Sequence, residues 1–301
     1  MQKHCDVKVK CVQSWRYSYD KKCRIFKRKS KIFIKKSGLA IQHILQNYMF
    51  ERFLERLSKS VYKENFIIKG GCLLSSIMGI QNRTTMDIDA NIIGIHFEKE
   101  EMQRIIEETI QLDLQDQIIF EISNVKDIKE GKKYTGYRFS LIGYFDKLKV
   151  PFHIDVSTGD TITPKAIHYH YKKLLEDGYI DILAYNAETI LAEKLQTILE
   201  LKIGNSRMKD YYDVYYLLHN DWDTLNVEIL KEAIQITFTN RKAIEDLHRI
   251  EEILDALENE SFLKKLWISY GEKHSYASNI KFNEIIKEIK SLASNLKISQ
   301  L

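Results

Sequence analysis

Two aspartates separated by one residue are the most informative side chains in the sequence. Asp87 and Asp89 begin a segment, Asp87 to Ile93, in which β-branched and polar residues alternate, and this pattern predicts a strand. Residues i and i+2 of a strand point to the same face, so the two carboxylates would lie side by side and repel each other. A divalent cation, Mg²⁺ (or Mn²⁺), relieves that repulsion and leaves positions open for phosphate. An exposed strand face with two solvated aspartates is the alternative, since the spacing alone is common.

A third carboxylate, Asp155, follows two residues after His153 in a second strand-like segment, Phe152 to Val156. From a neighbouring strand, Asp155 would complete a metal site. In phosphoryl chemistry such carboxylates hold ions that activate the attacking oxygen and stabilise the leaving pyrophosphate. We expect His153 to pack or to hydrogen-bond, because Mg²⁺ disfavours imidazole.

The sequence Lys69-Gly70-Gly71 lies between a short apolar strand and an apolar helical stretch, Cys72 to Met78. Glycines at a strand-to-helix turn let backbone N–H groups approach a phosphate, and the helix N-terminus favours an anion. An ordinary turn that needs a positive φ is the alternative. Neither a P-loop nor a GxGxxG pattern is present.

Candidate residues also lie in the second half of the chain. Lys194 lies beside the apolar face of a predicted helix and could reach triphosphate oxygens as a point charge, or else be a surface lysine. Asp210 and Asp213 are three residues apart and share one helix face. They could belong to an active site or could complement the dipole at a helix N-terminus.

The elements that position these residues indicate an α+β fold with a strand-rich first half and a helical second half. Helices are expected over 39–59 and 97–111, and strands over 117–122, 134–145 and 149–157. The last two strands would form a hairpin through Phe145-Asp146-Lys147-Leu148. Later helices are expected over 166–176, 187–203, 207–219, 226–236, 241–258 and 280–295.

Composition suggests a cytoplasmic protein, because the sequence shows no apolar stretch of membrane-spanning length, no secretory signal and four cysteines without metal-ligand spacing. Charge is uneven along the chain. Residues 1–37 contain 13 basic and 2 acidic residues, whereas the remainder contains 33 basic and 40 acidic residues. Such an arm could contact RNA phosphates or could be a solvated leader.

In their order and spacing, these segments resemble the AbiEii/AbiGii toxin family of nucleotidyltransferases, within the DNA polymerase β-like superfamily. The superfamily's usual Gly-Ser turn is Gly70-Gly71 here, so backbone N–H groups must serve the phosphate without a hydroxyl. The resemblance covers roughly residues 39–258 and rests on the following segments: Glu51 to Ser58, Phe66 to Gly71, Arg83 to Asp89, Ile154-Asp155 with Gly159-Asp160, Ala192-Glu193-Lys194, Arg207 to Asp213, and Ile236 to Arg241.

The resemblance implies a nucleotidyltransferase-like lobe with a mixed β-sheet over 39–165, and a helical lobe over 166–301 that completes the NTP cleft. Residues 1–38 would form a basic arm outside the core. The residues implied in catalysis are Asp87, Asp89, Lys194 and Asp210, and those implied in metal binding are Asp87, Asp89 and Asp155. Nucleotide binding is expected from Lys69, Gly70, Gly71, Arg83, Thr85, Lys194 and Arg207.

The implied activity is metal-dependent transfer of a nucleotide from an NTP to an acceptor such as tRNA. The protein would be the toxin of a toxin–antitoxin or phage abortive-infection pair. Its partners would be the NTP, the RNA acceptor and a cognate antitoxin, with no membrane. Two alternatives remain open: a nucleotide (GTP)-binding regulatory module without turnover, and a metal-dependent nuclease that uses the same carboxylates.

Overall fold

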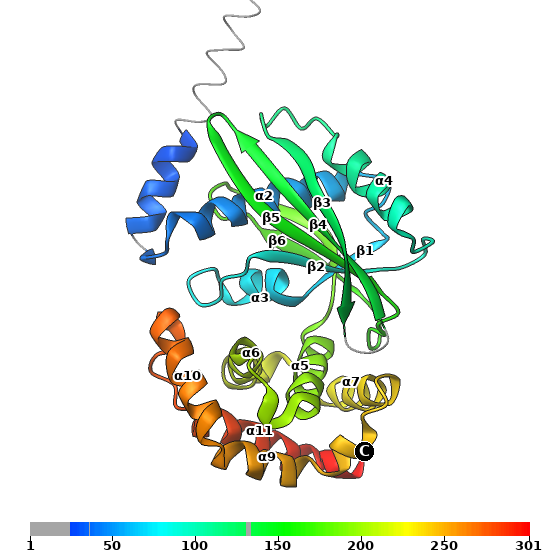
Figure 1. The fold of residues 1–301 in the computed structure, drawn as a ribbon, viewed down its shortest axis with the longest axis vertical. Coiled ribbons are helices and arrows are strands. Elements are labelled where there is room, and N and C mark those ends of the chain that lie inside the picture. Colours follow the sequence, from blue (N-terminus) through cyan, green and yellow to red (C-terminus); the bar gives the residue numbers. More distant parts are fainter. Residues whose placement is uncertain (1–24, 36, 131–133) are drawn as a thin grey trace, which may run out of the picture. The chain divides into compact units, whose positions relative to one another are not determined.

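The computed structural model describes residues 25–35, 37–130 and 134–301 and confirms an α+β fold. The chain forms two compact units (Figure 1). Unit 1 comprises the described residues up to Gly159 together with His168–Leu183, and unit 2 comprises Asp160–Ile167 and Ala184–Leu301.

Unit 1 is built on a seven-stranded mixed sheet with the strand order β3-β4-β5-β2-β1-β7-β6. Strands β2 and β5 are parallel, while β1 with β2, β3 with β4, and β4 with β5 are antiparallel. The strands are β1 (Phe66–Lys69), β2 (Asp87–Ile92), β3 (Ile119–Glu130), β4 (Tyr134–Phe145), β5 (Leu148–Thr158), β6 (Ile167–Lys172) and β7 (Tyr179–Ala184).

One face of this sheet is apolar and packs against the long helix α2 (Ile41–Lys59). The ring of Phe152 on β5 lies 5.8 Å from that of Phe50 on α2, centroid to centroid. Ile88 and Ile154, which pair across β2 and β5, are completely buried. Because side chains alternate along a strand, Asp87, Asp89 and Asp155 must project from the opposite face. Unit 1 also contains α3 (Gly70–Met78) and α4 (Lys99–Ile110).

The helix predicted over 166–176 is wrong, since this segment contains strand β6, which is followed by β7. Isoleucine, histidine and tyrosine alternate from Ile167 to Tyr171, and this is a period of two with β-favouring side chains. The buried Tyr171 and the half-buried Tyr169 are two residues apart, as expected for one face of a strand. The expected all-helical second half is corrected accordingly.

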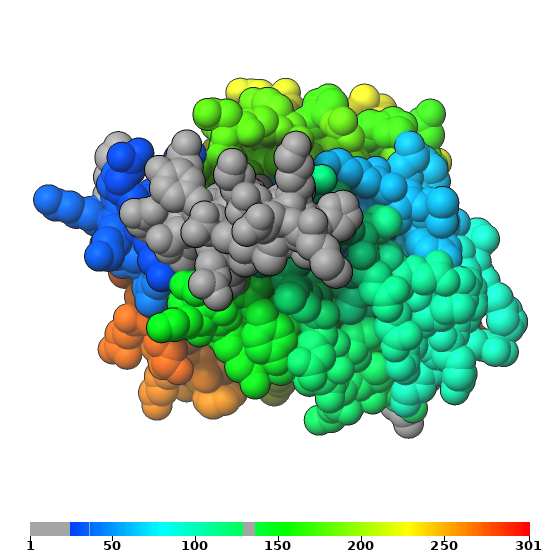
Figure 2. All heavy atoms as spheres, turned by 90° about the horizontal axis from the view of Figure 1, so that it is seen from above, coloured from blue at the N-terminus to red at the C-terminus, as the bar shows by residue number. Residues whose placement is uncertain are grey.

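The folded core begins earlier than the predicted residue 39. Residues 25–35 are helical, and the ring of the buried Phe26 lies 4.5 Å from Tyr48 and 5.3 Å from Phe145. Lys27 also pairs with Asp146 at 3.2 Å, and Figure 2 shows the two segments side by side at the surface of unit 1. The rest of the basic arm, residues 1–24, lies outside the described residues.

Unit 2 is helical, and α5 packs against both α6 and α7. The helix predicted over 241–258 is interrupted near Arg249, and α10 was not predicted. The α-helices are α5 (Ala187–Leu201), α6 (Met208–Asn220), α7 (Val227–Asn240), α8 (Ile244–His248), α9 (Ile250–Asn259), α10 (Ser261–Lys273) and α11 (Phe282–Leu296). No helix in the described part of the chain is long and apolar enough to cross a bilayer.

Candidate active site

Three carboxylates converge on the polar face of the sheet in unit 1. The parallel pairing of β2 with β5 places Asp89 directly opposite Asp155, and Asp87 precedes Asp89 by two residues on the same strand. One carboxylate oxygen from each residue lies within 4.8 Å of the other two. Asp155 is buried, whereas Asp87 and Asp89 are half-buried. We call this set the aspartate cluster, and its close-set oxygens fit a hard divalent ion.

The glycine turn packs directly against the aspartate cluster. Gly70 has φ +64°, and a Cβ at this position would lie 2.2 Å from Oδ2 of Asp89. The N–H of Gly71 donates to the same oxygen at 3.2 Å. The N–H of Gly71 thereby holds Asp89 in place, and the expected contact of this turn with a phosphate stays a prediction.

Thr85 and Arg83 shape the loop that leads into β2. The hydroxyl of Thr85 donates to Oδ1 of Asp87 at 2.8 Å, which orients that carboxylate. The buried Arg83 donates to the carbonyl of Thr84, and its own carbonyl accepts from the hydroxyl of Ser75 at 2.6 Å. Thr85 therefore supports a candidate metal ligand directly, and Arg83 fixes the loop.

Two basic residues flank the cluster in the sheet. Lys69, which is buried, lies opposite Asp89 in the pairing of β1 with β2. Arg138 lies opposite Asp155 in the pairing of β4 with β5. Its Nε and Nη2 donate to Oδ1 and Oδ2 of Asp155 at 2.7 and 2.5 Å, and these bonds raise the pKa of the guanidinium. Nη2 also lies 3.9 Å from Oδ2 of Asp87.

Arg138 was not predicted as a site residue, although the sequence held the signal. The predicted hairpin turns at Asp146 and Lys147, so Phe145 pairs with Leu148. In an antiparallel pair, counting outward from the turn by the same number of residues on each strand gives the partners. That count brings Arg138 opposite Asp155.

A second charged group lies within unit 2, where Lys194 of α5 contacts two acids of α6. Nζ of Lys194 lies 2.5 Å from Oδ1 of Asp210 and 3.2 Å from Oδ2 of Asp213. Nε of Arg207 lies 2.6 Å from Oδ2 of Asp210. Both aspartates are completely buried, while the side chain of Lys194 is 12% exposed and that of Arg207 is 51% exposed. These four residues form the Lys194 cluster.

Other segments that carry the resemblance to the toxin family have structural roles in unit 2. Arg241, which ends one of these segments, donates to Gln196 at 2.8 Å and to Glu193 at 3.0 Å. It also lies 3.6 Å from Asp160. Arg241 therefore ties together three parts of the chain that are distant in sequence.

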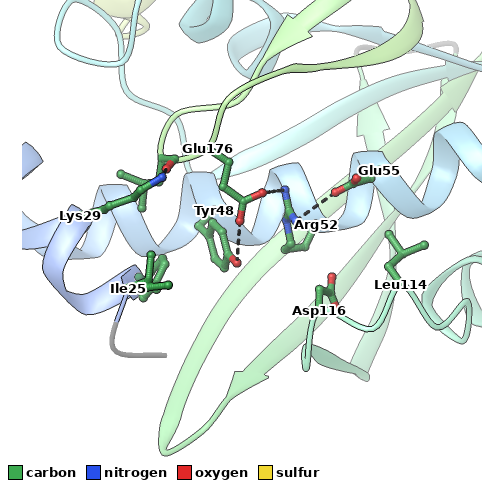
Figure 3. A pocket seen from close by; sticks show the side chains of 10 residues that line it. Ile25, Lys29, Tyr48, Arg52, Glu55, Leu114, Asp116 and Glu176 are labelled. Atoms are coloured by element: carbon green, nitrogen blue, oxygen red, sulfur yellow. Dashed lines mark hydrogen bonds and ion pairs between the residues drawn. The ribbon is translucent and has the colours of Figure 1, made fainter. Parts of the chain in front are cut away.

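The segment from Glu51 to Ser58 likewise contributes to structure rather than to the aspartate cluster. In Figure 3, Arg52 of α2 lies between Glu55 and Glu176 in the wall of a pocket of about 290 Å³. The Nη1 of Arg52 is 3.0 Å from Glu55, and its Nη2 is 3.3 Å from Glu176. None of the predicted site residues lines this pocket.

Similarity to known proteins agrees with this geometry. A family model described as the nucleotidyl transferase AbiEii toxin of type IV toxin–antitoxin systems matches residues 52–287. The protein belongs to the AbiEii family. The resemblance found in the sequence is therefore confirmed, and the protein is a nucleotidyltransferase toxin. A nucleotide substrate and an antitoxin partner go with membership of this family.

One solved structure supports the fold of this AbiEii protein, and a second is similar to a lesser degree. The crystal structure of JHP933 from Helicobacter pylori matches with a TM-score of 0.50 and 13% identity, covering 87% of this chain and 95% of that one. A second H. pylori structure, provisionally described as a nucleotidyltransferase, matches with a TM-score of 0.45 and 13% identity, covering 87% and 98% of the two chains. No curated protein sequence matches the chain.

Proposed function

We propose that the protein transfers a nucleotide from an NTP to a hydroxyl of an RNA acceptor, with tRNA as the expected acceptor and Mg²⁺ or Mn²⁺ as the cofactor. In the cell this activity would make the protein the toxin of a toxin–antitoxin or abortive-infection pair. The observation that carries the proposal is the aspartate cluster, in which three carboxylates from two adjacent strands lie within 4.8 Å of one another.

The surroundings of the cluster support this reading over that of a solvated acidic face. Asp87 accepts from Thr85, Asp89 accepts from Gly71, and Asp155 accepts two bonds from Arg138. Asp87 and Asp89, the two carboxylates that would hold the ion, are each oriented by a separate donor, and such preorganisation is what positional catalysis requires. A divalent ion bound there would supply charge neutralisation for the triphosphate and would polarise the acceptor hydroxyl.

The chain's own residues would divide the remaining work. Asp87 and Asp89 would hold the ion, and the turn at Gly70 and Gly71 would let the substrate approach the sheet closely. In-line attack of the acceptor hydroxyl on the α-phosphorus would form a new phosphodiester bond and release pyrophosphate.

We assign phosphate binding to the Lys194 cluster in unit 2. Lys194 and Arg207 bring two positive charges to Asp210 and Asp213, so the group is close to neutral. Arg207 is half exposed and therefore accessible to an anion. In this proposal Lys194 and Arg207 contact the triphosphate, while the two buried aspartates fix the position of Lys194.

The test is to incubate the protein with Mg²⁺, each of the four NTPs and total tRNA, and to measure released pyrophosphate together with RNA integrity. We expect pyrophosphate release that depends on both RNA and metal, with the RNA left uncut. RNA cleavage without pyrophosphate would indicate a nuclease instead. Nucleotide binding without either product would indicate a regulatory binding module.

A further inference from the structure

Arg138 occupies the carboxylate that would complete the metal site. Its Nε and Nη2 bind both oxygens of Asp155 at 2.7 and 2.5 Å, a two-point contact that matches the planar guanidinium to the carboxylate. The same Nη2 lies 3.9 Å from Asp87. The guanidinium of Arg138 therefore already neutralises part of the negative charge of two of the three carboxylates.

The register of the sheet places Arg138 beside the Asp155 carboxylate. Strand pairing places Lys69 opposite Asp89, Asp89 opposite Asp155, and Asp155 opposite Arg138, so a row of four charged residues crosses four adjacent strands. Nε and Nη2 of Arg138 contact both oxygens of Asp155, so a divalent ion held by this carboxylate would be close to the guanidinium. Like charges repel strongly at a site that is partly shielded from water.

We propose that Arg138 competes with the divalent ion for Asp155. Without nucleotide, the ion is held by Asp87 and Asp89, and Asp155 becomes a ligand only when the guanidinium leaves it. The side chain of Arg138 is 38% exposed, so it can turn outward, where the oxygens of a triphosphate offer new acceptors. Arg138 would then link complete metal loading to the arrival of the nucleotide. That the arriving ligand is a nucleotide rests on the function proposed above.

The experiment measures Mn²⁺ binding without nucleotide, by the loss of the free-ion signal in electron paramagnetic resonance. Four proteins are compared: wild type, Arg138→Gln, Asp155→Asn and the double variant. Arg138→Gln should bind Mn²⁺ at least about tenfold more tightly than wild type, because a repelling charge is removed and Asp155 is released. Asp155→Asn alone should change the affinity by less than about threefold. In the double variant the gain from Arg138→Gln should disappear.

Two control variants separate competition from a general loss of positive charge. Lys126→Gln removes a cation from β3, at the position paired with Arg138 one strand further from the cluster. Its Mn²⁺ affinity should stay within about twofold of wild type. Arg138→Lys keeps the charge and should bind Mn²⁺ more weakly than Arg138→Gln. Thermal unfolding in a chelator verifies that each variant is folded.

The opposite role, in which Arg138 orients Asp155 as a permanent ligand, gives opposite results. Arg138→Gln would then bind Mn²⁺ more weakly than wild type. Asp155→Asn would lower the Mn²⁺ affinity as much as Asp89→Asn does. Either result overturns the proposal, as does an absence of Mn²⁺ binding in both wild type and Arg138→Gln. The readout needs neither NTP nor RNA, so a failure of nucleotide transfer would leave it unaffected.

Discussion

Lys194 shows how one residue can serve stability and function together. It lies between two completely buried carboxylates, Asp210 and Asp213, and Arg207 is a second cation at Asp210. Removing one partner of a buried ionic group leaves uncompensated charge. We expect Lys194→Ala to lower the free energy of unfolding by about 3 kcal/mol, measured by urea denaturation. Loss of activity in this variant would therefore not by itself demonstrate contact with the triphosphate.

The matched control is Lys231→Ala on α7, because Lys231 also pairs with a carboxylate, but that partner, Glu228, is 82% exposed. Its unfolding free energy should change by less than about 0.5 kcal/mol. Lys194→Arg keeps the charge and should retain most of the stability. Because this variant stays folded, a rise in its KM for the NTP would report on contact with the nucleotide. A Lys194→Ala protein as stable as wild type would contradict the ionic role assigned to this lysine.

Glu51 introduces a pH dependence of stability that is unrelated to catalysis. It is completely buried on α2, and burial raises its pKa to about 8, although the N–H of Leu174 donates to it and acts in the opposite direction. In the unfolded chain a glutamate titrates near its ordinary value of about 4.5. Between these values the folded protein keeps a proton that the unfolded chain has released, so stability must fall as pH rises through this window.

Glu51→Gln removes this titration while preserving the shape of the protonated side chain. Urea unfolding at pH 5, 6.5 and 8.5 should show the variant close to wild type at the lowest pH. At the highest pH it should be more stable than wild type by roughly 2–4 kcal/mol. A constant difference between the two proteins across this range would show that Glu51 is ionised in the folded state.

The turn between β1 and α3 should be sensitive to a side chain at Gly70. Gly70 and Gly38 have similar positive φ values, +64° and +71°, but only at Gly70 would a Cβ meet Asp89. Alanine at either position costs about 1 kcal/mol or more through backbone strain. Only Gly70→Ala should also abolish transfer and the thermal shift caused by Mn²⁺. Equal activity of the two variants would show that the turn at Gly70 does not contribute to the active site.

The strands and helices that could be predicted are those in which one face is buried and the other is polar. Alternation predicted β2 and β5 and placed Asp87 and Asp89 on one face. The pairing that sets Asp155 opposite Asp89 is a register between two strands, which alternation within one strand does not fix. The same alternation is present in β6, but this segment was predicted to be a helix. The contact of Lys194 with Asp213 depends on how α5 packs against α6. Such packing depends on the side-chain shapes of both helices, which no spacing within one segment reveals.

For the whole molecule, the uneven charge predicts a role for residues 1–24, which hold seven basic and two acidic residues. Deleting them spares Phe26, which packs in the core, so folding and NTP binding should be retained. If this segment binds RNA, tRNA affinity should fall and its salt dependence should flatten by roughly 0.7–0.9 for each lost phosphate contact. Titrations at several salt concentrations measure this slope, and an unchanged slope would favour a solvated leader.

Nucleotide transfer to RNA at the aspartate cluster can be measured by following the label of an α-phosphate-labelled NTP into tRNA, for wild type and for Asp89→Asn, with Mg²⁺ present. We predict labelled RNA of unchanged length apart from the added nucleotides in the wild type, and at least a hundredfold less label with Asp89→Asn, which should unfold at nearly the wild-type temperature. Equal labelling by the two proteins, or no label in RNA with any NTP while the RNA is degraded, would contradict nucleotide transfer at this cluster.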